Sequence, residues 1–369
     1  WPSLWVTGLG FLLLAAMLQE MPVPRDVHQF HAAIVSRLKI LSHLDIAEKR
    51  VPQDGRVKLR VGSTEVDVRV SIIPMLHGEA VVLRLLDRSA PLLGLEHLGM
   101  SADDRRALTD VLGLPHGIVL VTGPTGSGKT TTLYACLSQI NEIERKIVTI
   151  EDPIEYHLHG INQIQVAPKA GLTFARGLRS ILRHDPDVVL VGEIRDEETA
   201  EIAVQASLTG HLVFSTLHTN DAPGAAVRLV DMGIEPYLVA SSVEVVMAQR
   251  LVRTVCPQCR ETYLEDLPTL RRRLGEDLPE QFVRGRGCEA CGGTGYAGRI
   301  GIFEIMPVTE AVRALVLERA SASAIRAQAM REGMRSLRQD GMRLVRQGVT
   351  TIDEVLRVSK DELREELRS

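Results

Sequence analysis

The sequence predicts an α/β protein whose main domain is a parallel β-sheet covered by helices on both faces. From about residue 100, short apolar runs alternate with helical segments, which is typical of parallel strands buried on both sides. Earlier in the chain, three segments alternate polar and apolar residues, which indicates a small antiparallel sheet. A length of 369 residues suits two or three domains.

Composition narrows the possible partners. A net charge of −4 gives no general attraction to nucleic acid, and only 4% aromatic residues argues against a surface that stacks bases. We therefore expect no nucleic-acid partner. Of the five cysteines, Cys136 is expected to be a small buried apolar side chain. The other four form two pairs, which favours a metal site in a reducing compartment over disulfides.

The chain begins at Trp1, and residues 4–18, "LWVTGLGFLLLAAML", are apolar and uncharged. This stretch is too short for a comfortable membrane span, and no basic segment precedes it as in a secretory signal. We interpret residues 1–24 as a fragment edge or a miscalled start, with a true anchor as the alternative. We expect no transmembrane span.

Residues 25–98 are predicted to form a small α+β domain. Apolar residues at helical spacing mark a helix over 25–44, and "VPQDGR" (51–56) is expected to be a turn because of its Pro and Asp-Gly. Three strands then follow in "RVKLRV", "EVDVRVSII" and "EAVVLRLL". Residues 88–99 are interpreted as a linker.

The predicted core domain covers residues 99–255. Its strands are "GIVLVT", "KIVTIE", "DVVLVGE" and "HLVFSTL", with helices expected near 129–140, 174–184, 196–209 and 221–232. A further helix is predicted over 236–252, "PYLVASSVEVVMAQRLV". A cysteine module (256–295) and a helical subdomain (296–369) complete the chain.

"GPTGSGKT" (123–130) matches the whole G-x-x-x-x-G-K-[ST] motif between a predicted strand and a predicted helix. Its glycines let backbone N–H groups point at phosphate oxygens, and the start of the helix adds its positive end. We expect Lys129 to reach the β- and γ-phosphates and Thr130 to hold Mg²⁺. The predicted nucleotide-binding residues of this loop are Gly123, Pro124, Thr125, Gly126, Ser127, Gly128, Lys129, Thr130 and Thr131.

The strand end "DVVLVGEIRD" supplies a candidate catalytic acid. Gly192 stands where most proteins with this loop have a magnesium-binding Asp, and Glu193 follows it. Glu193 is predicted to polarise the attacking water. The alternative is that Glu193 merely ends a strand at the surface. Because Gly192 offers no carboxylate, magnesium would rely on Thr130, phosphates, water and a carboxylate from elsewhere in the chain.

Two more predicted strands end in polar residues, and the carboxyl ends of parallel strands face the ligand crevice. Glu151, with Glu155 just beyond, could join the magnesium and water network, although an acidic turn is usually just solvated. His218 could sense the γ-phosphate or relay between subunits, whereas His211 is assigned a structural role. Around His218 the same strand end carries Thr216, Thr219 and Asn220.

Several arginines are candidates for contact with the nucleotide, because the charge of a phosphoryl transition state is commonly met by an arginine from another domain or subunit. Arg179 and Arg183 share a helix face, and Arg195 follows Glu193. Arg69 and Arg84 occupy strands of the small domain. For each one, a surface salt bridge is the alternative.

Cys256 and Cys259 form one Cys-x-x-Cys pair, and Cys288 and Cys291 form another. The pattern matches a tetrahedral four-cysteine zinc site. A structural role is expected, because four thiolates leave no open coordination position. Redox-active cysteines are the alternative.

These motifs together resemble one family, the secretion traffic ATPases of bacterial type II secretion and type IV pilus assembly. The resemblance runs from about Leu18 to the C-terminus. It rests on "VPQDGR", "GPTGSGKTTTLY", "TIEDPIEY", "LRSILRHDPDVVLVGEIRDEETAEIA", "TGHLVFSTLHTND", the cysteine pairs and "GRIGIFE". Within the family, "LDIAEKRVPQDGR", "DVRVS" and "AQRLVRTVCPQC" look more like type II secretion ATPases.

The resemblance implies a RecA-like P-loop NTPase core after a PAS-like domain, acting as a cytoplasmic homohexamer at the inner membrane. It implies ATP, Mg²⁺ and Zn²⁺ as cofactors, and inner-membrane platform proteins as partners in pseudopilus assembly for protein export. By the same resemblance, Glu151 belongs to the aspartate box, Glu193 is the Walker B acid and His218 belongs to the histidine box. The family also carries Gly at position 192, and the five arginines above resemble its nucleotide-sensing arginines.

Two departures from the family concern the beginning of the sequence. The family usually has a further N-terminal domain that docks on an inner-membrane partner, and residues 1–24 do not resemble it. Residues 4–18 also take the place of the small domain's opening strands. The alternatives kept are a type IV pilus assembly or DNA-uptake ATPase, and a truncated non-catalytic remnant that binds nucleotide.

Overall fold

The computed structural model describes residues 29–61, 64–86, 93–264 and 281–359, which fall into two units, Trp1–Pro91 and Leu92–Ser369. The apolar stretch 4–18, the start of the predicted helix 25–44 and the first half of the predicted linker lie outside the described residues. Among the described helices, none is both long and apolar enough to cross a bilayer.

The first unit packs helix α2 (His31–Leu41) with an antiparallel sheet of order β1-β2-β3. Its strands are β1 (Gln53–Val61), β2 (Thr64–Met75) and β3 (Gly78–Leu86), which confirms the three predicted strands. Val68, Val70 and Ile72 alternate along β2 into one small core, which also contains Val35 of α2.

The turn predicted at "VPQDGR" is wrong beyond Pro52. β1 begins at Gln53, and Gly55 pairs with Val70 of β2. A Cβ at Gly55 would lie 2.7 Å from the carbonyl oxygen of Ser42, so glycine here permits a close approach of strand and loop. Asp-Gly is thus used for packing within a strand.

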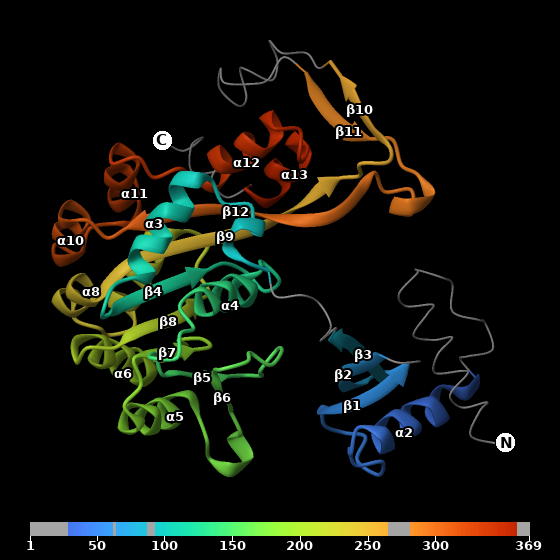
Figure 1. The fold of residues 1–369 in the computed structure, drawn as a ribbon. Coiled ribbons are helices and arrows are strands. Elements are labelled where there is room, and N and C mark those ends of the chain that lie inside the picture. The colour runs from blue at the N-terminus through green and yellow to red at the C-terminus, as the bar shows by residue number, and fades with distance from the viewer. Residues whose placement is uncertain (1–28, 62–63, 87–92, 265–280, 360–369) are drawn as a thin grey trace. The chain divides into compact units, whose positions relative to one another are not determined.

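The second unit contains a seven-stranded sheet of order β12-β9-β4-β8-β7-β5-β6 (Figure 1). All neighbouring pairs from β9 to β6 are parallel, and β12 runs antiparallel to β9 at one edge. The four predicted core strands are confirmed, and so is the α/β fold class. The strands are β4 (Gly117–Thr122), β5 (Ile147–Glu151), β6 (Asn162–Gln165), β7 (Val188–Val191), β8 (Leu212–Leu217), β9 (Val243–Val255) and β12 (Tyr296–Pro307).

Alternate residues of each central strand enter two different cores, one on each face of the sheet. Val119 and Val121 join a core with helices α3 (Ala102–Leu112) and α4 (Lys129–Gln139). Ile118 and Leu120 join the core on the opposite face. The helices of that face include α5 (Phe174–Ile181), α6 (Glu197–Leu208), α7 (Ala222–Asp231) and α8 (Pro236–Ser242).

The helix predicted over 236–252 is wrong after Ser242, where α8 ends and β9 begins. β9 pairs with β4 on one side and with β12 on the other. A buried helix and a buried strand give the same continuous apolar run, and the β-branched Val243, Val245 and Val246 favour the strand. The deciding partner, β12, lies far along the chain.

Two other boundaries differ from the prediction. Within the expected linker, Leu95 and Leu98 are buried in the core beneath α4, so residues 93–99 belong to the second unit. The C-terminal region begins with β12 rather than a helix. The predicted helices follow as α10 (Glu310–Leu317), α11 (Ala322–Arg331), α12 (Leu337–Arg346) and α13 (Ile352–Val358).

Glu354 fastens α13 to β9. Its carboxylate accepts hydrogen bonds from the backbone N–H of Arg253 at 2.9 Å and from Arg253 Nη2 at 2.7 Å, and Arg357 donates two more at 2.9 Å. Burial alone would raise the pKa of Glu354, but the bonds from Arg357 and Arg253 lower it to about 2. The ionised carboxylate therefore stabilises the fold.

We predict that this stabilisation depends on pH. A folded pKa below the usual value contributes stability above about pH 4.5, and this is lost as pH falls toward about 2. Glu354→Gln should therefore destabilise the protein by about 1–3 kcal/mol near neutral pH, with a deficit that shrinks in acid. Urea unfolding between about pH 6 and pH 3 measures this. The exposed Glu310→Gln on α10 is the control, and a pH-independent deficit would contradict the assignment.

Candidate functional site

Three parallel strands end together at one edge of the sheet. Thr122, the last residue of β4, pairs with Leu217, the last of β8, and Val191 at the end of β7 pairs with Ser215. The residues that follow these strands therefore leave the sheet side by side. They are the phosphate loop after β4, Gly192 and Glu193 after β7, and His218 after β8.

The loop 123–128 has the backbone that the motif predicts. Gly123, Gly126 and Gly128 have φ angles of +144°, +80° and +91°, which residues with a Cβ rarely adopt. A Cβ at Gly123 would also lie 2.6 Å from the carbonyl oxygen of Gln249 on β9. The loop therefore lies directly against β9, and α4 begins at its end with Lys129.

Lys129 and Ser127 are the polar side chains of this loop that fit a phosphate group. Lys129 Nζ donates to the carbonyl oxygens of Gly123 at 2.7 Å and Pro124 at 3.1 Å. Ser127 is 4% exposed, and its Oγ has no hydrogen-bond partner among the described residues. Thr130 and Thr131 follow in the first turn of α4. A glycine cradle, an unpaired hydroxyl and a lysine fit a bound phosphate.

Glu193 is held by the side chains of His218 and Arg195. Its Oε2 lies 3.0 Å from His218 Nε2, and its Oε1 lies 2.6 Å from Arg195 Nη2. Burial would raise the pKa of Glu193, but the hydrogen bonds from Arg195 and His218 lower it below its usual value. The carboxylate is therefore ionised at neutral pH and can orient a water molecule.

Lys129 and Glu193 sense each other's charge. Burial lowers the pKa of Lys129, and the negative charge of Glu193 partly opposes this. The two groups lie at the same end of the sheet, because the phosphate loop that leads to Lys129 follows β4 and Glu193 follows the end of β7. This geometry is what the sequence required for both to act on one nucleotide.

Gly192 is explained by close packing between β7 and β5. A Cβ at Gly192 would lie 3.3 Å from the carbonyl oxygen of Ile150 and 3.4 Å from Cα of Glu151. The backbone of Gly192 donates to Ile150 at 2.8 Å and accepts from Thr216 Oγ1 at 2.7 Å. A side chain here would require β5 to shift by a few tenths of an ångström.

The residues after His218 fix the loop that carries it. The backbone N–H of Thr219 donates to Thr122 Oγ1 at 2.9 Å, and the carbonyl oxygen of Asn220 accepts from Arg250 Nη2 at 2.8 Å. His211 lies at the other end of β8, where its Nδ1 is 2.9 Å from the carbonyl oxygen of Ala206. His218 therefore has the position of a site residue, and His211 has not.

Glu151 lies in a buried cluster of hydrogen bonds. Its Oε1 accepts from Thr149 at 2.5 Å and from Gln163 at 3.2 Å, and its Oε2 accepts from the hydroxyl of Tyr134 on α4. The backbone N–H of Glu155 lies 3.4 Å from the same hydroxyl. In this arrangement the Glu151 carboxylate connects β5 to α4.

Of the five candidate arginines, the structure brings Arg195 to the site. Arg179 instead pairs with Glu198 of α6 at 2.5 Å, and Arg183 donates to the carbonyl oxygen of Arg179 at 2.9 Å. Arg69 and Arg84 face each other across β2 and β3 of the first unit. Cys136 is buried in α4, and burial raises the pKa of its thiol to about 12, as expected for an inert side chain.

Sequence reasoning missed two buried residues that contact the phosphate loop, Gln249 and Arg250 of β9. Gln249 Oε1 accepts from Thr132 Oγ1 in α4 at 2.8 Å, and its Nε2 would lie 2.8 Å from a Cβ at Gly128. The sequence did contain a signal, because Gln249 and Arg250 are adjacent polar residues within the mostly apolar stretch 236–252. We overlooked it because this stretch was predicted to be a helix.

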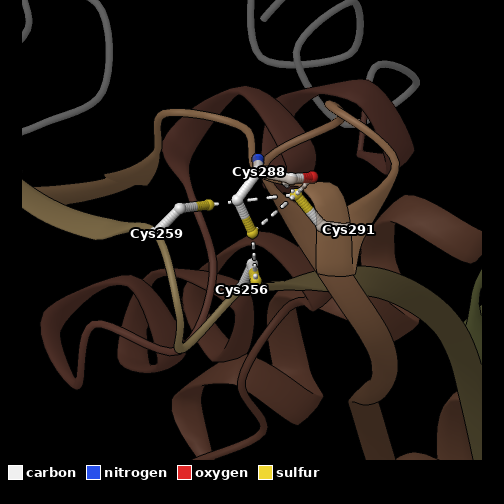
Figure 2. A group of neighbouring side chains, drawn as sticks. All are labelled: Cys256, Cys259, Cys288 and Cys291. Atoms are coloured by element: carbon white, nitrogen blue, oxygen red, sulfur yellow. Dashed lines mark hydrogen bonds between the residues drawn. The ribbon is translucent and has the colours of Figure 1, made fainter.

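The four paired cysteines converge at the far end of β9 (Figure 2). Cys256 directly follows β9, and Cys259 precedes β10 (Arg260–Tyr263), which pairs with β11 (Phe282–Gly285). Cys288 directly precedes a short 3₁₀ helix (Glu289–Cys291) before β12, and Cys291 is the last residue of that helix. All four Sγ atoms lie within 4.8 Å of one another.

Their geometry fits zinc. Neighbouring sulfur atoms are 3.7 to 3.9 Å apart, and tetrahedral Zn–S bonds of about 2.3 Å would place them about 3.8 Å apart. Disulfide sulfurs would be about 2.05 Å apart, so the cysteines are not bonded to each other. The backbone N–H groups of Cys288 and Gly295 lower the pKa of Cys291 to about 6, which favours a thiolate ligand.

A parallel sheet with a glycine-cradled lysine, an ionised Glu193 and a neighbouring His218 at one edge defines a P-loop ATPase with a RecA-like core. Residues 14–357 match the family described as type II/IV secretion system protein. The chain therefore belongs to this family, and it is an ATP hydrolase.

Individual relatives place the chain within this family. It is 57% identical over 348 residues to type II secretion system protein E of Pseudomonas aeruginosa, covering 94% of this chain and 68% of that protein. It is 53% identical to type II secretion system ATPase E of Vibrio cholerae, with the same coverage. Among solved structures, the ADP-bound pilus retraction motor PilT has a TM-score of 0.63 at 27% identity, covering 94% of this chain and 87% of that one. The identities with the two type II proteins confirm that this chain is a type II secretion ATPase.

We predict that the cysteine cluster contributes stability through zinc. Cys288→Ser with Cys291→Ser should remove one zinc equivalent per chain and lower the thermal midpoint, because metal binding is coupled to folding. Metal analysis and thermal unfolding with and without chelator measure this. Cys136→Ser is a control with unchanged zinc content. A metal-free wild-type protein with the same midpoint would contradict the zinc assignment.

Proposed function

We propose that this chain is the motor ATPase of type II protein secretion, coupling ATP hydrolysis to pseudopilus assembly at an inner-membrane platform. The main support is the sequence identity of 51–57% with proteins named type II secretion system protein E. The intact constellation of Lys129, Glu193 and His218 supports a working motor over a non-catalytic remnant.

For the chemical step, we propose that the phosphate loop binds the triphosphate through its backbone N–H groups, Ser127 and Lys129. Bound Mg²⁺, held by Thr130, would neutralise charge on the β- and γ-phosphates. Glu193 orients the attacking water and accepts its proton, and His218 holds Glu193 and senses the γ-phosphate. Glu151 acts by orienting Tyr134 and the start of α4.

The same proposal includes the assembly. We propose that the chain acts as a homohexamer in the cytoplasm, peripherally associated with the inner membrane and working on platform proteins. Arg84, Arg179 and Arg183 are exposed on the surface, which leaves them accessible to a neighbouring subunit. We propose that they and Arg69 respond to nucleotide in the ring. Cleavage of the γ-phosphate would release those contacts and let domains move.

A type IV pilus assembly or DNA-uptake ATPase is the second candidate. A pilus motor, the retraction motor PilT, has a similar structure at 27% identity. The type II relatives are about twice as similar in sequence.

At the enzymatic level, we predict that Lys129→Ala abolishes both nucleotide binding and hydrolysis. Glu193→Gln should bind ATP normally but lower kcat at least 100-fold, because the amide cannot accept the proton of water. Steady-state phosphate release and fluorescent-nucleotide binding measure the two effects. The surface variant Glu310→Gln serves as control. Normal turnover in Glu193→Gln would remove this residue from the mechanism.

At the cellular level, we predict that the chain, expressed in strains lacking their own ATPase, restores type II secretion but not pilus assembly. The Lys129→Ala variant should restore neither. Measuring exported enzyme and surface pili in parallel distinguishes the two candidates. Restoration of pili alone would favour the second one.

A further inference from the structure

Arg250 is a buried cation beside the phosphate loop that no step above uses. Only 8% of it is exposed. Thr122 pairs with Ala248, so β9 continues past the point where β4 turns into the loop. Gln249 and Arg250 are the first residues of that extension, and they lie where the nucleotide-binding edge of the sheet begins.

The Arg250 guanidinium is placed between three segments of the site. Nη2 donates to the carbonyl oxygen of Asn220 at 2.8 Å, in the loop that carries His218. Nη1 donates to the carbonyl oxygen of Gln249 at 3.0 Å and would lie 3.1 Å from a Cβ at Gly123. The guanidinium thus links β9 to the His218 loop by hydrogen bonds and lies against the first residue of the phosphate loop.

Arg250 brings a positive charge to the phosphate loop, close to Lys129. Arg250 also repels Lys129, adding to the effect of burial that lowers the lysine pKa. Two cations converging on one loop favour an anionic ligand, and the fork geometry of arginine lets one side chain hold two carbonyls.

We propose that Arg250 is a positioning residue for ATP hydrolysis, holding the His218 loop against the Gly123 end of the phosphate loop. A shift of the phosphate loop would then move the His218 loop. Because His218 Nε2 lies 3.0 Å from Glu193 Oε2, the shift would also reposition Glu193. Arg250 acts through these groups and does not touch the reacting atoms. The proposal rests on ATP hydrolysis at this site.

The first test compares Arg250→Lys with Arg253→Met, a change three residues further along β9 that removes the hydrogen bond from Arg253 Nη2 to Glu354. Arg250→Lys keeps the charge but loses the fork, so kcat should fall at least about tenfold while KM for ATP stays within about threefold. Arg253→Met should lower stability but keep kcat. Normal kcat in Arg250→Lys, or the same kcat loss in both variants, would overturn the proposal.

The second test is a double-mutant cycle for kcat between Arg250→Lys and His218→Asn. If Arg250 acts through the His218 loop, the double variant should turn over about as slowly as the slower single variant. Multiplied losses would mean independent roles and would overturn the proposal. Failure of the chain to restore secretion, with these kinetics intact, would count against the proposed cellular function alone.

Discussion

In-register parallel pairing of β4, β8 and β7 is the constraint on which the ATPase site depends. It brings the phosphate loop, His218 and Glu193 off the sheet at one edge. The register is locked because Val119 and Val121 enter one core while Ile118 and Leu120 enter the other. A slip of one residue would exchange the two faces and move the catalytic groups apart.

β9 extends this arrangement beyond the end of β4. It provides Gln249 and Arg250 next to the phosphate loop, is bound to Glu354 through Arg253, and ends directly before Cys256. Val255 at the end of β9 pairs with Tyr296 at the start of β12, so the cysteine cluster lies directly beyond the last pair of these two strands. A zinc ion there would hold the strand that supports the phosphate loop, which connects a structural metal to catalysis.

The sequence was informative where motif and local pattern coincide. The glycines, Lys129, Glu193, His218 and the cysteines could be singled out as candidates because their residue types and spacing indicate the chemistry. The helix predicted over 236–252 was wrong because an apolar run does not reveal its distant partner β12, and that error hid Arg250. The contacts of Glu151 and Arg179 with Tyr134 and Glu198 depend on packing between elements, which no local pattern encodes.

An experimental structure with Mg²⁺ and a non-hydrolysable ATP analogue tests the central claim most directly. Lys129 Nζ now binds the carbonyl oxygens of Gly123 and Pro124. The account predicts that it turns to the β- and γ-phosphates, that Ser127 Oγ gains a partner, and that Glu193 faces a water in line with the γ-phosphate. A triphosphate bound away from residues 123–130, with Lys129 still on its own carbonyls, would contradict it.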